Sequence, residues 1–126
     1  YQASTALPPP IVAAGSASLR LIMENPEMRI KLLETAGELR QRIIELGFQT
    51  TPDNTPIIPV MLSELTRAKD LSLFMESNGI ILPFINYPVK QEKYLVRIAV
   101  SISHTIEQIE EVVENLNKWK DKYGTN

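Results

Sequence analysis

The chain has 126 residues, 44% of them hydrophobic and 22% charged, and a formal net charge of -2, which together fit one globular domain. Acidic and basic residues are mixed along the chain, which argues against a nucleic-acid partner or an anionic membrane surface, because each needs clustered Lys and Arg. The absence of cysteine excludes disulfides and cysteine-based zinc sites, the single His104 excludes a multi-histidine metal site, and no stretch approaches the roughly 20 apolar residues of a membrane span.

The first 24 residues predict an extended linker followed by a helix. Three consecutive prolines, Pro8 to Pro10, restrict the backbone, and because proline is tolerated in a first helical turn, a helix can begin at about Pro9. We therefore expect residues 1–24 to form an interdomain linker and linking helix, and residues 25–126 to form a small domain. The chain does not begin with methionine, and we expect it to be a piece of a longer protein.

A strongly amphipathic helix is predicted from Pro26 to Leu46. Its apolar residues recur at alternating spacings of four and three: Leu32, Ala36, Leu39, Ile43 and Leu46. Asn25 is expected to cap its start, and Gly47 is expected to end it, because glycine accepts the left-handed conformation.

The middle of the chain predicts apolar strands around a second helix. The expected elements are a possible short strand at Phe48 to Thr51, a strand at Pro56 to Leu62, a helix that Ser63 caps and that runs to about Ser77, and a strand at Ile80 to Ile85. Pro59 and Pro83 interrupt the last two strands and weaken them, because proline cannot donate a hydrogen bond to a ladder. Tyr87 to Lys93 is expected to be a loop.

The C-terminal part predicts one more strand and one more helix. In Tyr94 to Ile102, alternate residues are apolar, namely Val96, Ile98, Val100 and Ile102, so this face is expected to be core and Arg97 to project from the other. A capping box, Thr105 with Gln108, opens the last helix. Its expected apolar residues are Ile106, Ile109, Val112, Val113, Leu116 and Trp119, and Tyr123 to Asn126 is expected to be a fraying tail. The whole order predicts an α+β fold, a small mostly antiparallel sheet with helices packed on one face.

Arg97, Ser4, Thr5 and His104 are the residues with candidate chemistry. The planar guanidinium of Arg97 can hold a carboxylate through two parallel hydrogen bonds, although a solvated arginine on an open sheet face is the alternative. The hydroxyls of Ser4 and Thr5 can bond a phosphate oxygen, or they belong to an ordinary linker. Histidine is a common general acid or base, but no Ser, Asp or Glu constellation surrounds His104, so we interpret it as structural.

Several motifs together resemble the α-oxoamine synthases. The run Ser4-Thr5-Ala6-Leu7-Pro8-Pro9 resembles the family's "FST-ALPPA" segment. Glu45 to Phe48 and then Thr55 to Val60 resemble "LGF … SPIIPV", and Gly79-Ile80 resembles the "GI-V" turn into a strand. Val96 to Ile98, followed by Ser103 to Thr105, resembles "LRI … AHT". The motifs occur in the family's order and cover essentially the whole chain.

The resemblance implies a fold-type I enzyme that depends on pyridoxal phosphate, condenses an amino acid with an acyl-CoA, and is a cytoplasmic homodimer. This chain would be its C-terminal small domain, and the preceding large domain would carry the lysine that binds the cofactor, so the chain alone is expected to be inactive. Arg97 matches the arginine that binds the carboxylate of the amino acid. Thr5, with Ser4 beside it, matches the hydroxyl residue that reaches the cofactor phosphate of the neighbouring subunit.

Two alternatives remain open. A class I or II aminotransferase shares the fold and an equivalent arginine, and a stand-alone ligand-binding or dimerisation module would need no large domain. One motif also departs from the α-oxoamine synthases, which often have a "P-VP-G" loop near the substrate entrance. The segment Tyr87 to Lys93 keeps Pro88-Val89 but lacks the second proline and the glycine. This departure leaves the class of acyl-CoA substrate open.

Overall fold

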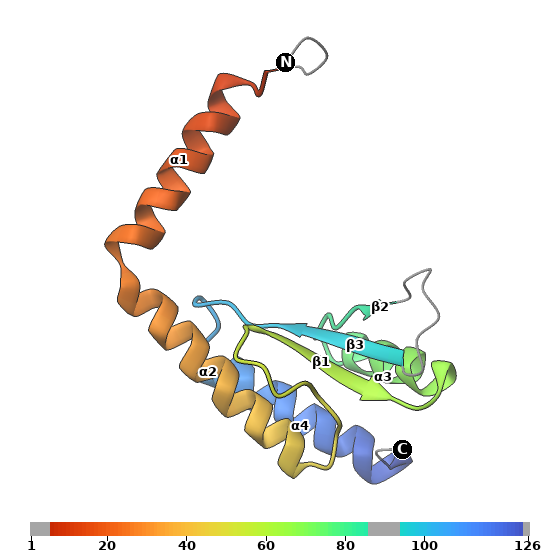
Figure 1. Ribbon diagram of the computed structural model, residues 1–126. Helices are drawn as coiled ribbons and strands as arrows, with labels where there is room; N and C mark the ends of the chain where they lie inside the picture. The colour runs from red at the N-terminus through yellow and green to blue at the C-terminus, as the bar shows by residue number, and fades with distance from the viewer. Residues whose placement is uncertain (1–5, 86–93, 125–126) are drawn as a thin grey trace.

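The computed structural model describes residues 6–85 and 94–124 (Figure 1). The elements in chain order are α1 (Pro9–Glu24), α2 (Pro26–Glu45), β1 (Ile57–Leu62), α3 (Leu65–Ser77), β2 (Phe84–Ile85), β3 (Tyr94–Ala99) and α4 (Ile106–Tyr123). The expected loop at Tyr87 to Lys93 lies outside the described residues. None of the helices in the described part of the chain has both the length and the apolar character that crossing a bilayer requires.

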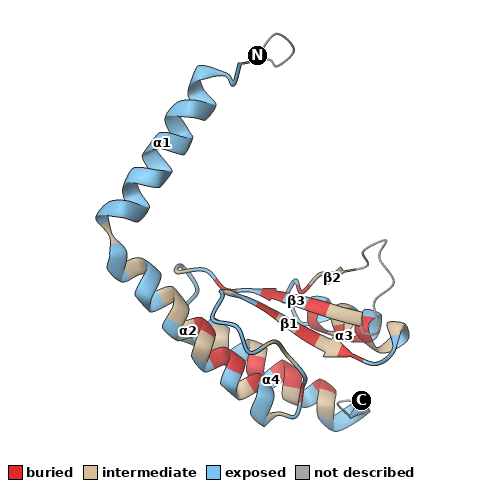
Figure 2. Cartoon of the chain, in the orientation of Figure 1, coloured by how far each residue is buried: buried red, intermediate tan, exposed pale blue. Residues whose placement is uncertain are grey.

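The three strands form an antiparallel sheet in the order β1-β3-β2, with helices against one face. The buried strand residues alternate along the chain and share that face: Ile58, Val60, Leu62, Val96 and Ile98. Helices α2, α3 and α4 contribute the other side of the core, with Ala36, Leu39, Ile43, Ala68, Leu71, Met75, Val113, Leu116 and Trp119 (Figure 2). The expected α+β fold is therefore confirmed.

Helix α1 takes no part in this core. None of its residues is buried, and it leads away from the sheet (Figures 1 and 2). Large apolar side chains are nevertheless exposed along it: Ile11, Val12, Leu19, Leu21, Ile22 and Met23. A helix that is apolar on several sides is typical of a covered element rather than of a free surface helix.

Pro59 does not weaken β1, because its nitrogen faces the outer edge of the sheet. The Val100 N–H donates to the Pro56 carbonyl at 2.8 Å, so the even-numbered residues of this segment face β3. The odd-numbered ones face outward, and the Met61 N–H accordingly donates to the Gln49 carbonyl at 2.8 Å on that side. A proline at an outward position removes no ladder hydrogen bond. The expected weakening of this strand is wrong.

Pro83 has the opposite effect on the other edge of the sheet. Its carbonyl accepts the Arg97 N–H at 3.0 Å, so the backbone of residue 83 faces β3. In such a pair, a residue other than proline would donate its own N–H to the Arg97 carbonyl. Proline has no N–H, and the ladder stops there. The strand expected at Ile80 to Ile85 is therefore reduced to Phe84–Ile85.

Glycines close α2 and α3 in the same way. Gly47 and Gly79 have φ angles of 89° and 80°, and the residue after each donates back to the third-last residue of its helix. These bonds, Phe48 N–H to Ile43 O at 3.2 Å and Ile80 N–H to Met75 O at 2.9 Å, define two Schellman motifs. The expected end at Gly47 is confirmed.

Replacing Gly79 by alanine is expected to lower the free energy of unfolding by roughly 1–2 kcal/mol, because a Cβ is strained in the left-handed region. An added Cβ meets no atom within 4 Å, so crowding contributes nothing. Gly37 is the matched control, since it lies inside α2 with equally open space. Gly37→Ala is expected to raise the free energy of unfolding by about 0.5–1 kcal/mol. Urea unfolding measures both, and shifts of the same sign would contradict the positive φ at Gly79.

Other local expectations fail at the ends of the elements. Asn25 is the N-cap residue of α2, as expected, but its side chain makes no capping bond. Its backbone and side-chain N–H groups both donate instead to the Leu21 carbonyl at the end of α1, at 3.2 and 2.7 Å. Ser63 does not cap α3, whose N-cap residue is Glu64 with no side-chain cap. The strand expected at Phe48 to Thr51 is a single bridge between Gln49 and Met61.

The prediction for the last helix is correct at its start and wrong for Ile106 and for the expected fraying at Tyr123 and Gly124. Thr105 and Gln108 form the capping box, with the Thr105 N–H donating to Gln108 Oε1 at 3.0 Å. Ile106 is not part of the buried stripe, since it is 77% exposed. The described end of the chain is anchored, because Arg67 donates to the carbonyls of Tyr123 and Gly124 at 2.8 and 2.6 Å.

One ion pair joins α2 to α4 across the helix layer. Arg42 and Glu110 form a two-bond pair, with Nη2 to Oε2 at 2.6 Å. The hydrogen bonds from Arg42 hold the pKa of Glu110 below its ordinary value of 4.5. Because the folded pKa is the lower one, the stabilisation is present above the ordinary pKa and is lost as the pH falls through the lowered value.

The free energy that Glu110→Gln removes is therefore expected to be largest near neutral pH and to vanish in acid. The effect is small and falls with added salt, because both side chains are partly exposed. Glu114→Gln is the control, since Glu114 meets Lys118 only at 4.0 Å on an exposed surface. Thermal unfolding at a series of pH values measures both, and an equal, pH-independent loss would contradict the pair.

Candidate functional site

Arg97 lies at the centre of the open face of the sheet. The register places Pro59 opposite Arg97, Ile57 opposite Ala99, and both Met61 and Ile85 opposite Leu95. Paired residues of an antiparallel sheet share a face. The strand positions that share the face of Arg97 are therefore all apolar: Ile57, Pro59, Met61, Ile85, Leu95 and Ala99. One charged side chain stands in the middle of an apolar strand surface.

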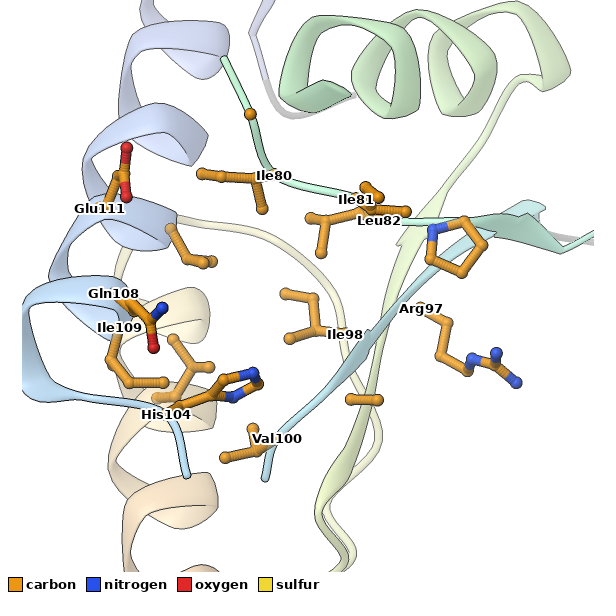
Figure 3. Close-up of a pocket in the computed structure, with 15 residues that line it drawn as sticks. Ile80, Ile81, Leu82, Arg97, Ile98, Val100, His104, Gln108, Ile109 and Glu111 are labelled. Carbon is orange, nitrogen blue, oxygen red and sulfur yellow. The ribbon is translucent and has the colours of Figure 1, made fainter. Parts of the chain in front are cut away.

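The Arg97 side chain is exposed, and its guanidinium has no hydrogen-bond or ion-pair partner within residues 6–85 and 94–124. Figure 3 shows it directed away from Ile98 and His104, on the opposite side of the strand. The sequence prediction that Arg97 projects from the face opposite the core is therefore correct. An unpaired guanidinium has all its donors available for an anion.

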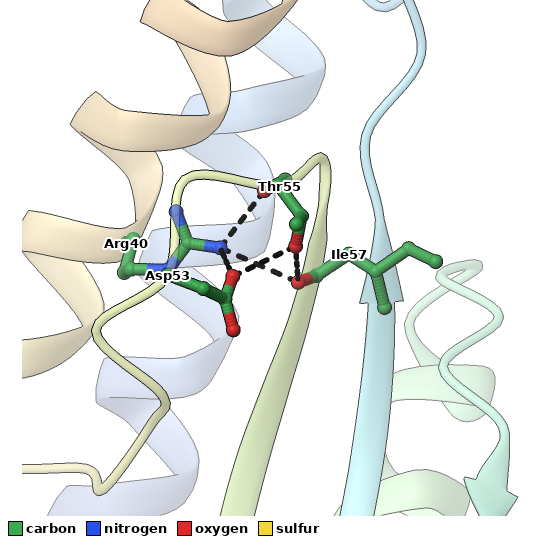
Figure 4. A network of polar contacts seen from close by, with 4 residues as sticks. All are labelled: Arg40, Asp53, Thr55 and Ile57. Carbon is green, nitrogen blue, oxygen red and sulfur yellow. Dashed lines mark hydrogen bonds and ion pairs between the residues drawn. The ribbon is translucent and has the colours of Figure 1, made fainter.

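Three other arginines of the fold are bound to protein acceptors. Arg40 is 5% exposed, and its Nη2 donates to Asp53 Oδ1 at 3.1 Å, to the Thr55 carbonyl at 2.8 Å and to the Ile57 carbonyl at 3.3 Å (Figure 4). This network ties α2 to the start of β1, the edge strand. Arg42 and Arg67 hold Glu110 and the carbonyls at the end of α4. The fold uses these three arginines structurally.

Sequence reasoning missed Arg40, although a signal was present. Arg40 follows Ala36 by four residues and precedes Ile43 by three, so it lies on the apolar stripe of α2. A charge on such a stripe indicates a buried partner, because an unpaired charge in a core is strongly unfavourable. The partners lie 13 to 17 residues further along the chain, which the spacing of α2 alone does not indicate.

His104 holds the turn before α4. Its Nδ1 accepts the Ser101 N–H at 3.1 Å, and its own backbone N–H donates to the Ser101 carbonyl at 3.1 Å. A cavity of about 310 Å³ lies beside it, and its apolar lining includes Ile80, Ile98, Val100 and Ile109 (Figure 3). Arg97 also contributes to the lining of this cavity, but its guanidinium is directed to the opposite side of β3, away from His104.

Ser4 and Thr5, the residues expected to bind phosphate, lie outside the described residues. Their position relative to Arg97 therefore remains a prediction. The geometry of the candidate site consists of Arg97 and the apolar strand positions around it. This arrangement is suited to binding one carboxylate, because a guanidinium pairs with two carboxylate oxygens and apolar surroundings strengthen the pairing.

Comparison with known proteins decides the family. The family model described as "Aminotransferase class I and II" matches residues 1–116, which is nearly the whole chain. The chain belongs to the aminotransferase class I and II family.

Relatives within the family carry the names that the sequence motifs predict. An 8-amino-7-oxononanoate synthase of Thermoanaerobacter pseudethanolicus is 34% identical over 116 residues, which are 91% of this chain and 29% of that protein. The resemblance to the α-oxoamine synthases is thereby confirmed. The chain spans about a third of the length of the curated relatives that it matches.

Solved structures confirm the fold. A structure of serine palmitoyltransferase (SPT) with pyridoxal phosphate matches with a TM-score of 0.89 and 24% identity, over 98% of this chain and 32% of that one. The 8-amino-7-oxononanoate synthase of Francisella tularensis matches with a TM-score of 0.78 and 24% identity, over 94% of this chain and 35% of that one. At this identity the likeness concerns the fold. The chain therefore shares its fold with about a third of each of these two proteins.

Proposed function

We propose that this chain is the C-terminal part of an α-oxoamine synthase that depends on pyridoxal phosphate and condenses an amino acid with an acyl-CoA. The observation that carries the proposal is the Arg97 guanidinium, which lies in the middle of an apolar strand surface and has no partner within residues 6–85 and 94–124. The names of the relatives and the motif order support the synthase over the aminotransferase alternative. A stand-alone module is disfavoured by the relatives, since they are about three times as long.

Arg97 is the proposed binding residue for the carboxylate of the amino acid. Its two parallel hydrogen bonds would fix both the position and the rotation of the carboxylate, because the guanidinium and the carboxylate are planar. In the part of the sheet that the structure describes, the apolar strand neighbours of Arg97 offer no competing side-chain acceptor. Once a second domain covers this face and excludes water, the pairing becomes stronger.

The domain organisation follows from the same surfaces. We propose that residues 1–24 are the linker and linking helix, and that residues 25–126 are the small domain. The exposed apolar residues of α1, among them Leu19 and Ile22, and the apolar open face of the sheet would both be covered by a large cofactor-binding domain. A cytoplasmic homodimer with sites at the subunit interface belongs to this proposal.

The described residues fit the substrate carboxylate rather than the cofactor. Lys31 and Lys69 lie exposed on helices α2 and α3, and neither sits in the family's lysine motif. Thr5, with Ser4 beside it, would hold the cofactor phosphate of the neighbouring subunit. When bound, pyridoxal phosphate supplies an electron sink for carbanion charge, and the protein orients the reacting groups.

An assay of the protein at the length of its relatives tests the reaction class. Incubated with pyridoxal phosphate, an amino acid and an acyl-CoA, it is expected to release free CoA in proportion to the amino acid consumed. Amino-group exchange with a 2-oxo acid, without CoA release, would identify the aminotransferase instead. The 126 residues alone are expected to release no CoA.

A further inference from the structure

Two prolines flank Arg97, one in β1 and one directly before β2. Pro59 in β1 is its partner in the register. Pro83 continues the register of β2, and its carbonyl accepts the Arg97 N–H at 3.0 Å. Residues directly opposite in an antiparallel sheet share a face, with Cβ atoms about 4.5–5.5 Å apart. The stem of Arg97 therefore rises between two pyrrolidine rings, both of them partly buried.

A proline ring has properties that suit such a flanking position. It has almost no side-chain conformational entropy to lose, so it forms a rigid wall. It carries no donor or acceptor, so it cannot recruit the guanidinium. Arginine has large rotamer entropy, and binding a ligand to a mobile arginine costs that entropy. A stem confined before binding loses less of it when a carboxylate arrives.

Both prolines are compatible with the sheet at these positions for different reasons. Pro59 turns its nitrogen to the outer edge, so β1 keeps its pairing with β3. Pro83 ends the ladder, so the chain before Phe84 separates from β3, and Ile81 is 83% exposed there. Neither is needed for the pairing of β3 with β1. Pro59 on the outer edge also blocks pairing with a further strand, and Pro83 ends the ladder, but neither of these roles requires that the two rings stand directly opposite Arg97.

We propose that Pro59 and Pro83 are positioning residues, which confine the Arg97 side chain between them and keep its guanidinium free for a carboxylate. The inference rests on the proposed function in one respect, namely that the ligand of Arg97 is a carboxylate. The confinement itself is a property of this chain and can be measured without ligand.

Pro59→Ala in the protein at the length of its relatives is the cleanest test, because the new N–H points away from the ladder. Affinity for the amino acid is expected to fall about 2- to 10-fold, the range for one newly mobile side chain, with kcat unchanged. The NMR order parameter of the Arg97 Nε–Hε group is expected to fall in the unliganded protein. Pro59→Val restores a branched wall and is expected to recover most of both. Pro52→Ala, at an exposed loop proline, is the matched control and is expected to change neither.

A second pair of variants tests the lack of competing acceptors. Pro59→Glu places a carboxylate directly across from Arg97 and is expected to lower the affinity further while the melting temperature is maintained, because the two side chains pair. Pro59→Gln has nearly the same size without the charge and is expected to lower affinity less. Equal effects of Glu and Gln would contradict the claim that the guanidinium is held free.

The outcomes separate this inference from the proposed function. If Arg97→Ala abolishes amino-acid binding while Pro59→Ala changes neither affinity nor Arg97 order, the positioning role is overturned and the carboxylate site stands. If Arg97→Ala leaves binding unchanged, the proposed carboxylate site at Arg97 fails, and the CoA-release assay alone decides the reaction class. The order parameter then still decides whether the prolines confine the side chain.

Discussion

Arg97→Lys in the protein at the length of its relatives is expected to weaken amino-acid binding about 10- to 100-fold. A lysine keeps the positive charge but offers one ammonium in place of a planar fork, so one of two charge-assisted hydrogen bonds is lost. Such a bond contributes roughly 1.5–3 kcal/mol, and each 1.4 kcal/mol corresponds to about tenfold in affinity. Arg97→Ala loses both bonds and is expected to exceed 100-fold.

The fold is expected to tolerate both changes, because the Arg97 guanidinium has no partner among the described residues. Melting temperatures should therefore match that of the unmodified protein. Arg29→Lys is the matched control, since Arg29 lies exposed on α2, away from the sheet. Equilibrium titration with the amino acid, followed by the cofactor absorbance, measures the affinity. An unchanged affinity for Arg97→Lys would remove Arg97 from the site.

Trp119→Ala is expected to lower the free energy of unfolding by about 3–5 kcal/mol, the largest stability effect among the substitutions considered. Trp119 is 0% exposed and lies among the rings of Phe48 and Tyr123, at centroid distances of 6.1 and 5.5 Å. Its Nε1 donates to Asp70 Oδ2 at 2.8 Å, and Arg67 lies 5.2 Å above the ring. Removing the Trp119 side chain is expected to leave a cavity between α3, α4 and the segment after α2.

A loss of this size approaches the total stability of a typical domain, which is about 5–15 kcal/mol, so a large unfolded fraction is expected at moderate temperature. Trp119→Phe keeps a ring but loses the bond to Asp70, and it should cost much less. Ile106→Ala, on the same helix but 77% exposed, is expected to change stability by less than about 0.5 kcal/mol. Trp119 is the one tryptophan of the chain, so its replacement removes the fluorescence signal that would otherwise report unfolding. Circular dichroism in urea is therefore the suitable measurement. A loss below about 1 kcal/mol would contradict the packing of α4.

The orientation of Arg97 was predictable from the sequence, whereas the lack of an acidic partner among the described residues was not. Alternation in Tyr94 to Ile102 is enough to place Arg97 opposite Val96 and Ile98, because side chains alternate in any strand. Whether an acidic side chain meets it across the sheet depends on which strands pair and in which register. The pairing with Pro59 and Pro83 decides this, and it joins residues 38 and 14 positions away.

The two prolines show the same limit. Both lie in apolar runs and look equally disruptive in the sequence, yet β1 is intact around Pro59 and β2 stops at Pro83. The difference is the direction of one nitrogen, toward the outer edge or toward β3. That direction is a property of the register and has no local signature.

The sequence by itself determined the helices from Pro9, Pro26 and Thr105, the core face of β3, the glycine end at Gly47 and the family resemblance. These follow from backbone geometry and hydrogen bonds that span only a few residues. The tertiary structure alone decided the length of β2, the buried network of Arg40 and the apolar surroundings of Arg97. Each of these depends on contacts between residues far apart in the chain, and only packing and strand register bring such residues together.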